Sequence, residues 1–161
     1  MRSRGYQYRA TADWPYDIAS GGAVYKIEDN KILVLVLYRN EPDGRHYHLP
    51  KGTLHFDETL ENCAQREISE ESGAAVELRG YLGAFTDDYI SPNWHFFISK
   101  TTHYFAAEFR EFTREHDSEH DGVEFLPLKA TRENLMKTEP EKRENLILDR
   151  LEKFLRLANK I

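Results

Sequence analysis

The sequence predicts a single domain of the α/β class, built around one acidic helix. Three observations predict it: β-branched and aromatic runs typical of strands recur between residues 23 and 126, a helix is expected over residues 58–72, and an amphipathic helix closes the chain. A chain of 161 residues with 40% hydrophobic content is long enough for one sizeable core and short for two. We therefore expect one domain over residues 1–161, with residues 1–17 as an N-terminal arm.

Turn signals separate the strand-like runs. The polar residues at 28–31 favour a hairpin between the first two runs, and Glu41-Pro42-Asp43-Gly44 marks the next turn. Residues 50–56 are expected to form a loop, and the N-terminal arm is a candidate for an added edge strand. The expected strands cover residues 23–27, 32–38, 47–49, 76–85, 101–109 and 122–126.

Two helices are expected from capping residues and apolar periodicity. Asp57 is the expected N-cap of the helix over residues 58–72, and Gly73 lies just past its end, where glycine favours termination. Thr138 is the expected cap of the final helix, with Pro140 in its first turn. The apolar stripe of this last helix is typical of core packing and consists of Ile147, Leu148, Leu151, Phe154 and Leu155.

Composition narrows the class of protein. A net charge of −6 argues against bulk binding of nucleic acid, which usually relies on a basic surface. The single cysteine, Cys63, excludes an intrachain disulfide and favours a reducing compartment. Residues 1–15 contain no apolar run of signal-peptide length, and no stretch reaches the ~20 apolar residues of a membrane span. We therefore expect a cytoplasmic protein without a membrane anchor, either monomeric or homodimeric.

The helix expected over residues 58–72 carries three carboxylates on one face. Glu67, Glu70 and Glu71 stand at positions i, i+3 and i+4, so they share about one turn. A charged helix face is usually just solvated, but acids within an apolar stripe are costly to bury unless a counter-charge is supplied. A divalent cation is the simplest counter-charge. The apolar residues on the face of Glu67 and Glu71 are Leu60, Cys63, Ala64 and Ile68.

The donor chemistry indicates Mg²⁺, with Mn²⁺ as the alternative ion. Oxygen donors favour a hard cation, and Mg²⁺ usually binds one or two carboxylates together with substrate phosphates. Arg66 stands four residues before Glu70 and is expected to orient that carboxylate through an ion pair. Glu58 lies nine residues before Glu67, on the opposite side of an ideal helix, so we assign it to the helix start and not to the metal.

The residues around this helix resemble the Nudix family. Gly52, then five residues, Glu58, then seven residues, and the run Arg66-Glu67-Ile68-Ser69-Glu70-Glu71-Ser72-Gly73-Ala74 match the Nudix box at every defined position. Ala74 is smaller than the aliphatic residue common at the end of the box. The flanking segments also resemble their Nudix counterparts, at residues 20–23, 49–52 and 124–128.

The resemblance implies a fold and a reaction. The fold is an α/β/α sandwich in which a mixed β-sheet is flanked by the Nudix helix and a C-terminal helix. The reaction is Mg²⁺-dependent hydrolysis of a pyrophosphate bond in a nucleoside diphosphate linked to another moiety. By position, the implied metal ligands are Glu67, Glu70, Glu71 and the carbonyl of Gly52.

The catalytic residues are less narrowly defined. The general base is left open between Glu67, Glu70 and Glu119, with Arg66 as the residue that orients the acids. Glu119 belongs to the loop His116-Asp117-Ser118-Glu119-His120-Asp121, which lies where family members often place a further acid. The two histidines of this loop lack the regular ligand spacing of a transition-metal site.

A shorter resemblance concerns the substrate. Residues 100–105 resemble the Lys-Thr-x-x-Tyr-aromatic stretch of the diadenosine polyphosphate hydrolases within the family. It implies a dinucleoside polyphosphate or a related small nucleotide as substrate, with Tyr104 either a packed aromatic or a contact to a base or phosphate. The candidate phosphate contacts are Lys51, Lys100, Arg39 and Arg45, and the candidate stacking residues are Tyr47 and Trp94.

Other functions stay open at this point. In the same enzyme class they are hydrolysis of ADP-ribose or nucleotide sugars, of nucleoside triphosphates, of diphosphoinositol polyphosphates and of RNA 5′ ends. In a different class, a non-catalytic nucleotide-binding module keeps the fold without the chemistry, but such a module is expected to have lost one of the acids. The box therefore predicts the reaction, whereas the substrate depends on residues 100–105.

Overall fold

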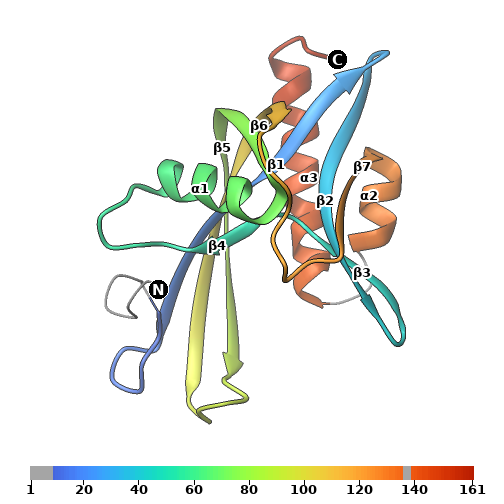
Figure 1. Cartoon of the computed structure of the whole chain (residues 1–161). Helices are drawn as coiled ribbons and strands as arrows, with labels where there is room; N and C mark the ends of the chain where they lie inside the picture. The colour runs from blue at the N-terminus through green and yellow to red at the C-terminus, as the bar shows by residue number, and fades with distance from the viewer. Residues whose placement is uncertain (1–8, 136–138) are drawn as a thin grey trace.

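A mixed β-sheet forms the centre of the molecule, with helices on both faces (Figure 1). The computed structural model describes residues 9–135 and 139–161, the latter with side chains from Arg143 onward. The strands are β1 (Tyr16–Glu28), β2 (Lys31–Glu41), β3 (Gly44–His48), β4 (Lys51–Thr53), β5 (Ala74–Ile90), β6 (Phe97–Phe112) and β7 (Gly122–Pro127). The helices are α1 (Leu60–Ser72), α2 (Leu128–Leu135) and α3 (Glu139–Leu157).

The strand pairing makes the sheet mixed, as expected. In the described residues the order is β3-β2-β1-β6-β5, with β4 paired to β1 and β7 paired to β2. β1 and β6 run parallel, whereas the other pairs are antiparallel. The hairpin expected at residues 28–31 is confirmed: Asp29 and Asn30 both have positive φ, which suits a two-residue turn between twisted strands.

Several local expectations were wrong because long-range contacts decide them. Residues 51–53 were expected in a loop, but they form β4 by pairing with residues 19–21 of β1. α2 was not expected at all; it begins directly after β7 and buries Leu135 in the core. Within the arm, β1 begins at Tyr16, and residues 9–15 form no strand. The arm's first eight residues and the expected cap Thr138 lie outside the described residues.

The start of α1 also differs from the expectation, whereas its end agrees. Thr59, and not Asp57, is the N-cap: its backbone is extended and its side chain accepts a hydrogen bond from the N–H of Asn62. At the other end Gly73 adopts the left-handed conformation with φ 78°, and its N–H donates to the carbonyl of Ser69. The helix therefore begins two residues later than expected.

Two hydrophobic cores lie on opposite faces of the sheet. Alternating residues of each central strand point to opposite faces, so Val34 and Val36 of β2 pack on the α2–α3 side while Leu35 packs on the α1 side. Ile68 is the residue of α1 that enters the second core. This arrangement confirms the α/β/α sandwich. Among the described helices, none is long and apolar enough to cross a membrane.

The apolar stripe of α3 packs against the sheet, as expected. Ile147, Leu148, Leu151 and Leu155 are fully buried, and Phe154 packs against the same cluster. The stripe faces β1, β3 and β5, which α3 contacts. Burial of these side chains fixes the helix on the sheet, and the first turns of the helix thereby reach the region between β3 and β6.

Replacing Leu151 by alanine is expected to lower the free energy of unfolding by about 2–5 kcal/mol, because the truncation leaves a cavity under α3. Leu157 lies at the end of the same helix and is 76% exposed, so Leu157→Ala is the matched control, with an expected change below about 0.5 kcal/mol. Urea titrations followed by circular dichroism measure both changes. Equal losses in the two variants would contradict the packing of α3.

Candidate functional site

A cavity of about 920 Å³ lies where α1, β4, β6 and the loop before β7 converge. Among the expected metal ligands, Gly52, Glu67, Glu70 and Glu71 all line it. Of the other expected site residues, Arg39, Lys51, Lys100, Tyr104 and Glu119 also line it. The sequence pattern thus placed most of its candidates in one cavity, although they come from five separate segments of the chain.

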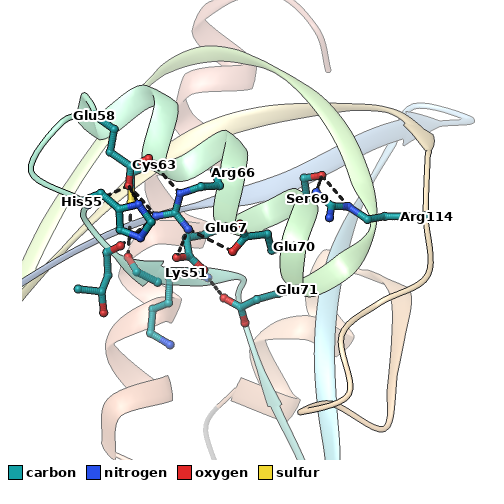
Figure 2. A network of polar contacts seen from close by, with 12 residues as sticks. Lys51, His55, Glu58, Cys63, Arg66, Glu67, Ser69, Glu70, Glu71 and Arg114 are labelled. Atoms are coloured by element: carbon teal, nitrogen blue, oxygen red, sulfur yellow. Dashed lines mark hydrogen bonds and ion pairs between the residues drawn. The ribbon is translucent and has the colours of Figure 1, made fainter. Parts of the chain in front are cut away.

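Glu67, Glu70 and Glu71 of α1 point from the helix toward the segment that carries Lys51 (Figure 2). The side chains of Glu67 and Glu71 are 13% exposed, and that of Glu70 is 38% exposed. Glu71 Oε1 accepts a hydrogen bond of 3.0 Å from the backbone N–H of Lys51, which ties the end of α1 to β4. The partial burial expected for Glu67 and Glu71 is therefore found.

Gly52 allows the acid cluster to lie against β4. A Cβ atom at this position would lie 2.0 Å from the carboxyl carbon of Glu67, so any larger residue would displace that side chain. The carbonyl oxygen of Gly52 lies 3.6 Å from the Cys63 Sγ, under the same helix. Burial raises the pKa of the Cys63 thiol to about 12, which keeps it a neutral, small apolar group.

Arg66 holds three acids at once, rather than Glu70 alone. Its guanidinium donates to Glu67 Oε1 at 2.5 Å and to Glu70 Oε2 at 3.2 Å. It also donates to the carbonyl of Thr53 in β4 at 3.0 Å. Figure 2 shows Arg66 between Glu58 on one side and Glu67 and Glu70 on the other. Arg66 does not line the cavity, so it orients the acids from outside the cavity lining.

The position of Glu58 differs from the expectation for an ideal helix. Because α1 begins at Leu60, Glu58 precedes the helix and folds back along it. Both of its carboxylate oxygens accept hydrogen bonds from Arg66, at 2.9 and 2.6 Å, and one accepts from the N–H of His55. Burial alone would raise the pKa of Glu58, but these hydrogen bonds lower it to about 2. Glu58 is thus an ionised partner of Arg66 outside the cavity.

The acids that line the cavity are not fully neutralised by nearby cationic side chains. Burial raises the pKa of Glu67, although the hydrogen bond from Arg66 opposes the shift. Burial also raises the pKa of Glu71 to about 8, despite the opposing charge of Lys51. Carboxylates outnumber cationic side chains among the residues that line the cavity. An oxygen-rich donor set with unbalanced negative charge fits a hard dication such as Mg²⁺.

Two lysines and three arginines line the cavity and supply positive charge: Lys51, Lys100, Arg9, Arg39 and Arg143. Lys51 Nζ lies 3.6 Å from Glu144 Oε1, and Lys100 lines the cavity from the neighbouring strand β6. Burial and the nearby charge of Lys51 lower the pKa of Lys100. Arg39 is fixed by a hydrogen bond of 2.9 Å from its Nε to the carbonyl of Glu119.

Tyr104 is a packed aromatic whose hydroxyl meets a buried acid. Its ring belongs to the core on the α3 side of the sheet, and its hydroxyl donates to Glu144 Oε1 at 3.0 Å. Glu144 also accepts a hydrogen bond of 2.9 Å from the backbone N–H of Leu49. Sequence reasoning missed Glu144. The signal was present, because this acid lies three and four residues before Ile147 and Leu148, on the apolar face of α3.

Three of the expected substrate contacts do not line the cavity. The guanidinium of Arg45 lies over the ring of Tyr38, 3.9 Å from its centroid, and pairs with Glu124. Tyr47 packs against the same Tyr38 ring. Trp94 stacks on Phe96, in the connection between β5 and β6. None of the three is among the residues that line the cavity, so the structure does not bring them together with the other candidates.

The loop before β7 contributes more than the one acid singled out from sequence. Glu119 lines the cavity with an exposed side chain, 3.8 Å from the guanidinium of Arg39. Asp117 and the buried His120 line it as well, and His48 joins them from the end of β3. The rings of His48 and His120 are in contact, with their Nε2 atoms 2.7 Å apart. Sequence spacing gave no indication of this contact, because 72 residues separate the two histidines.

The ion pair of Glu58 with Arg66 gives a pH-dependent stability prediction. Glu58→Gln is expected to lower the free energy of unfolding by about 2 kcal/mol at pH 7, because a partly buried guanidinium loses its bidentate partner. The pKa of Glu58 is below its ordinary value of 4.5 in the folded state, so its contribution is complete above pH 4.5 and is lost as pH falls toward 2.

Urea titrations of the natural protein and the variant across this pH range measure the difference. Glu61→Gln is the matched control, since Glu61 is an exposed acid in the first turn of the same helix, with an expected change below about 0.5 kcal/mol. A difference between the natural protein and Glu58→Gln that stays constant as pH falls toward 2 would rule out the depressed pKa.

Comparison with solved structures shows the fold. The chain is similar to the C. elegans Ap4A hydrolase in a binary complex, with a TM-score of 0.67, 20% identity, and coverage of 87% of this chain and 98% of that one. It is also similar to a MutT NUDIX hydrolase from Burkholderia pseudomallei, with a TM-score of 0.56, 22% identity, and coverage of 84% and 98%.

Comparison with protein sequences shows the family. The chain is 35% identical over 78 residues to an ADP-ribose pyrophosphatase of Methanocaldococcus jannaschii, a match that covers 48% of this chain and 44% of that protein. The chain thus spans less than half the length of this curated relative. The family model of the NUDIX domain, in contrast, matches residues 18–148, which include β4, α1 and the loop before β7. This protein therefore belongs to the NUDIX domain family.

Proposed function

We propose that this protein is a Mg²⁺-dependent pyrophosphohydrolase that acts on a nucleoside diphosphate linked to another moiety. The observation that carries the proposal is the convergence of Glu67, Glu70 and Glu71 on one side of a cavity whose other walls carry Lys51 and Lys100. Carboxylates that bind a dication and ammonium groups that bind phosphate are the two requirements of this chemistry. Membership of the NUDIX domain family supports the same reaction.

Glu67, Glu70, Glu71 and the carbonyl of Gly52 are the proposed metal ligands. When bound, the ion neutralises charge on the phosphate oxygens and activates the attacking water. The chain prepares the site for it: Gly52 leaves room for the Glu67 carboxylate, and Arg66 fixes the orientation of Glu67 and Glu70. Burial disfavours the ionised form of Glu71, and a cation at this end of the cluster would stabilise it.

Glu70 is the proposed general base. It is the most exposed of the three acids, and its contact with Arg66 is longer than that of Glu67. The guanidinium contacts Glu67 Oε1 at 2.5 Å and Glu70 Oε2 at 3.2 Å, so it engages the Glu67 carboxylate more closely. Glu119 lines the cavity from the loop before β7, away from the α1 cluster in the chain, and is the second candidate. A base must reach the proton of the attacking water, and Glu70, itself a proposed ligand, lies on the same turn of α1 as Glu67 and Glu71.

Within this reaction we infer a dinucleoside polyphosphate as the substrate. Cationic side chains from four elements line the cavity: Arg39 of β2, Lys51 of β4, Lys100 of β6 and Arg143 of α3. Cations spread over several walls suit a long phosphate chain better than a single pyrophosphate, because each phosphate adds a negative charge. ADP-ribose is the second candidate, favoured by the name of the Methanocaldococcus jannaschii relative.

Glu70→Gln is expected to lower kcat at least about 10²-fold, because glutamine cannot accept the proton of the attacking water. The assay follows phosphate-containing products of diadenosine tetraphosphate with Mg²⁺ present. Glu61→Gln, an exposed change on the same helix and away from the cavity, is expected to retain full activity. Full activity in Glu70→Gln would exclude this residue as the base. Intact substrates across a broad panel of nucleotide pyrophosphates would instead indicate a binding module.

Product analysis separates the two candidate substrates. Asymmetric hydrolysis of diadenosine tetraphosphate releases ATP and AMP, whereas hydrolysis of ADP-ribose releases AMP and ribose 5-phosphate. We expect the higher kcat/KM for diadenosine tetraphosphate, and we expect Lys100→Met to lower it mainly through KM, because the lysine contacts phosphate in the ground state as well as in the transition state. Chromatography of both reactions at matched enzyme concentration is the measurement. A higher kcat/KM for ADP-ribose would overturn the assignment.

A further inference from the structure

A second group of metal-binding side chains lies next to the acids of α1. His48, at the end of β3, and His120, in the loop before β7, approach with their Nε2 atoms 2.7 Å apart. His120 Nε2 also lies 3.6 Å from Glu71 Oε2. One donor atom from each of the three residues lies within 4.8 Å of the other two. Two imidazoles and a carboxylate therefore converge on one point at the cavity wall.

Asp117 fixes the orientation of His120. Its Oδ1 atom lies 2.6 Å from His120 Nδ1 and also accepts a hydrogen bond of 3.1 Å from the backbone N–H of His120. A carboxylate in this position holds the proton on Nδ1, so the lone pair of Nε2 points toward His48 and Glu71. The same carboxylate–imidazole pair orients histidine ligands in many metal sites. His120 is only 1% exposed, so this orientation is fixed by burial as well.

The spacing of the donor atoms is close to that of a metal site. Ligands of a tetrahedral ion at about 2.0–2.1 Å are separated from one another by roughly 3.4 Å. The two separations around His120 Nε2, 2.7 Å to His48 and 3.6 Å to Glu71, lie on either side of this value. A small rotation of the His48 ring would lengthen the 2.7 Å separation between the two Nε2 atoms.

We propose that His48, His120 and Glu71 bind a transition-metal dication of the Zn²⁺ or Co²⁺ type, with a remaining coordination position open to the cavity. Imidazole nitrogens select such ions over Mg²⁺, whereas the oxygen donors of Glu67, Glu70 and Gly52 do not. Glu71 belongs to both donor sets, so occupation of this site changes the ligands left for Mg²⁺. The alternative is a plain hydrogen bond between two neutral imidazoles.

This proposal is separate from the proposed function, because it concerns binding without any nucleotide. The test titrates the metal-free protein of 161 residues with Co²⁺ in a large excess of Mg²⁺, which occupies oxygen-only sites. Visible d–d absorption and equilibrium dialysis measure the bound ion. We expect one equivalent of Co²⁺, with the intense visible bands of a site of low coordination number and mixed nitrogen and oxygen donors.

Variants assign the bound ion to these residues. His48→Ala and His120→Asn are each expected to weaken Co²⁺ binding at least about 10-fold, since each removes one ligand of the ion. Asp117→Asn keeps both imidazoles and is expected to weaken binding about 10- to 100-fold by releasing the ring orientation. His116→Ala is the matched control from the same loop, because His116 contacts the carbonyl of Asp117 and not the cluster; it is expected to bind Co²⁺ as the natural protein does.

Two results would overturn the proposal. One is a natural protein that holds no Co²⁺ against excess Mg²⁺. The other is Co²⁺ binding that is equally strong in the natural protein, His48→Ala and His120→Asn, each shown to be folded by circular dichroism. If a histidine variant does not fold, Asp117→Asn decides the question by the same titration. If the natural protein binds Co²⁺ but hydrolyses none of the nucleotide substrates, the result counts against the proposed function alone.

Discussion

The guanidinium of Arg66 is the interaction on which the acid cluster depends. It lies under α1 and binds the carboxylates of Glu58, Glu67 and Glu70, which would otherwise repel one another across a partly buried surface. The same group binds the carbonyl of Thr53, so the strand that carries the candidate phosphate contacts is placed relative to the helix. One cation thereby fixes the helix start, the acid face and β4 together.

The limits of this interaction explain the rest of the site. Arg66 does not reach Glu71, whose carboxylate is buried beside the backbone of Lys51 and keeps a raised pKa. The ionised form of Glu71, at the cavity end of α1, is therefore the form that a bound cation would stabilise. That is the end closest to His120, so the two donor sets meet at Glu71.

Features that depend on local periodicity were predictable from the sequence. The acid face of α1, the glycine cap at Gly73 and the buried stripe of α3 follow from residues three and four positions apart. Features that depend on distant contacts were not. β4 exists because β1 pairs with it, and the site in which Glu144 meets Leu49 joins positions 95 residues apart. The predicted start of α1 was wrong for a third reason. Thr59 and Asp57 are both residue types that cap helices well, and the contact of Glu58 with Arg66 is compatible with the cap at Thr59.

Glu144 connects the C-terminal helix to the cavity. Its carboxylate accepts hydrogen bonds from the backbone of Leu49 and the hydroxyl of Tyr104 and lies beside Lys51, and its own position is set by the packing of α3 on the sheet. The packing of the core-facing residues of α3 therefore affects the cavity wall as well as stability. Homologues with different substrates are expected to differ in the position of this helix on the sheet, even where their metal-binding residues are identical.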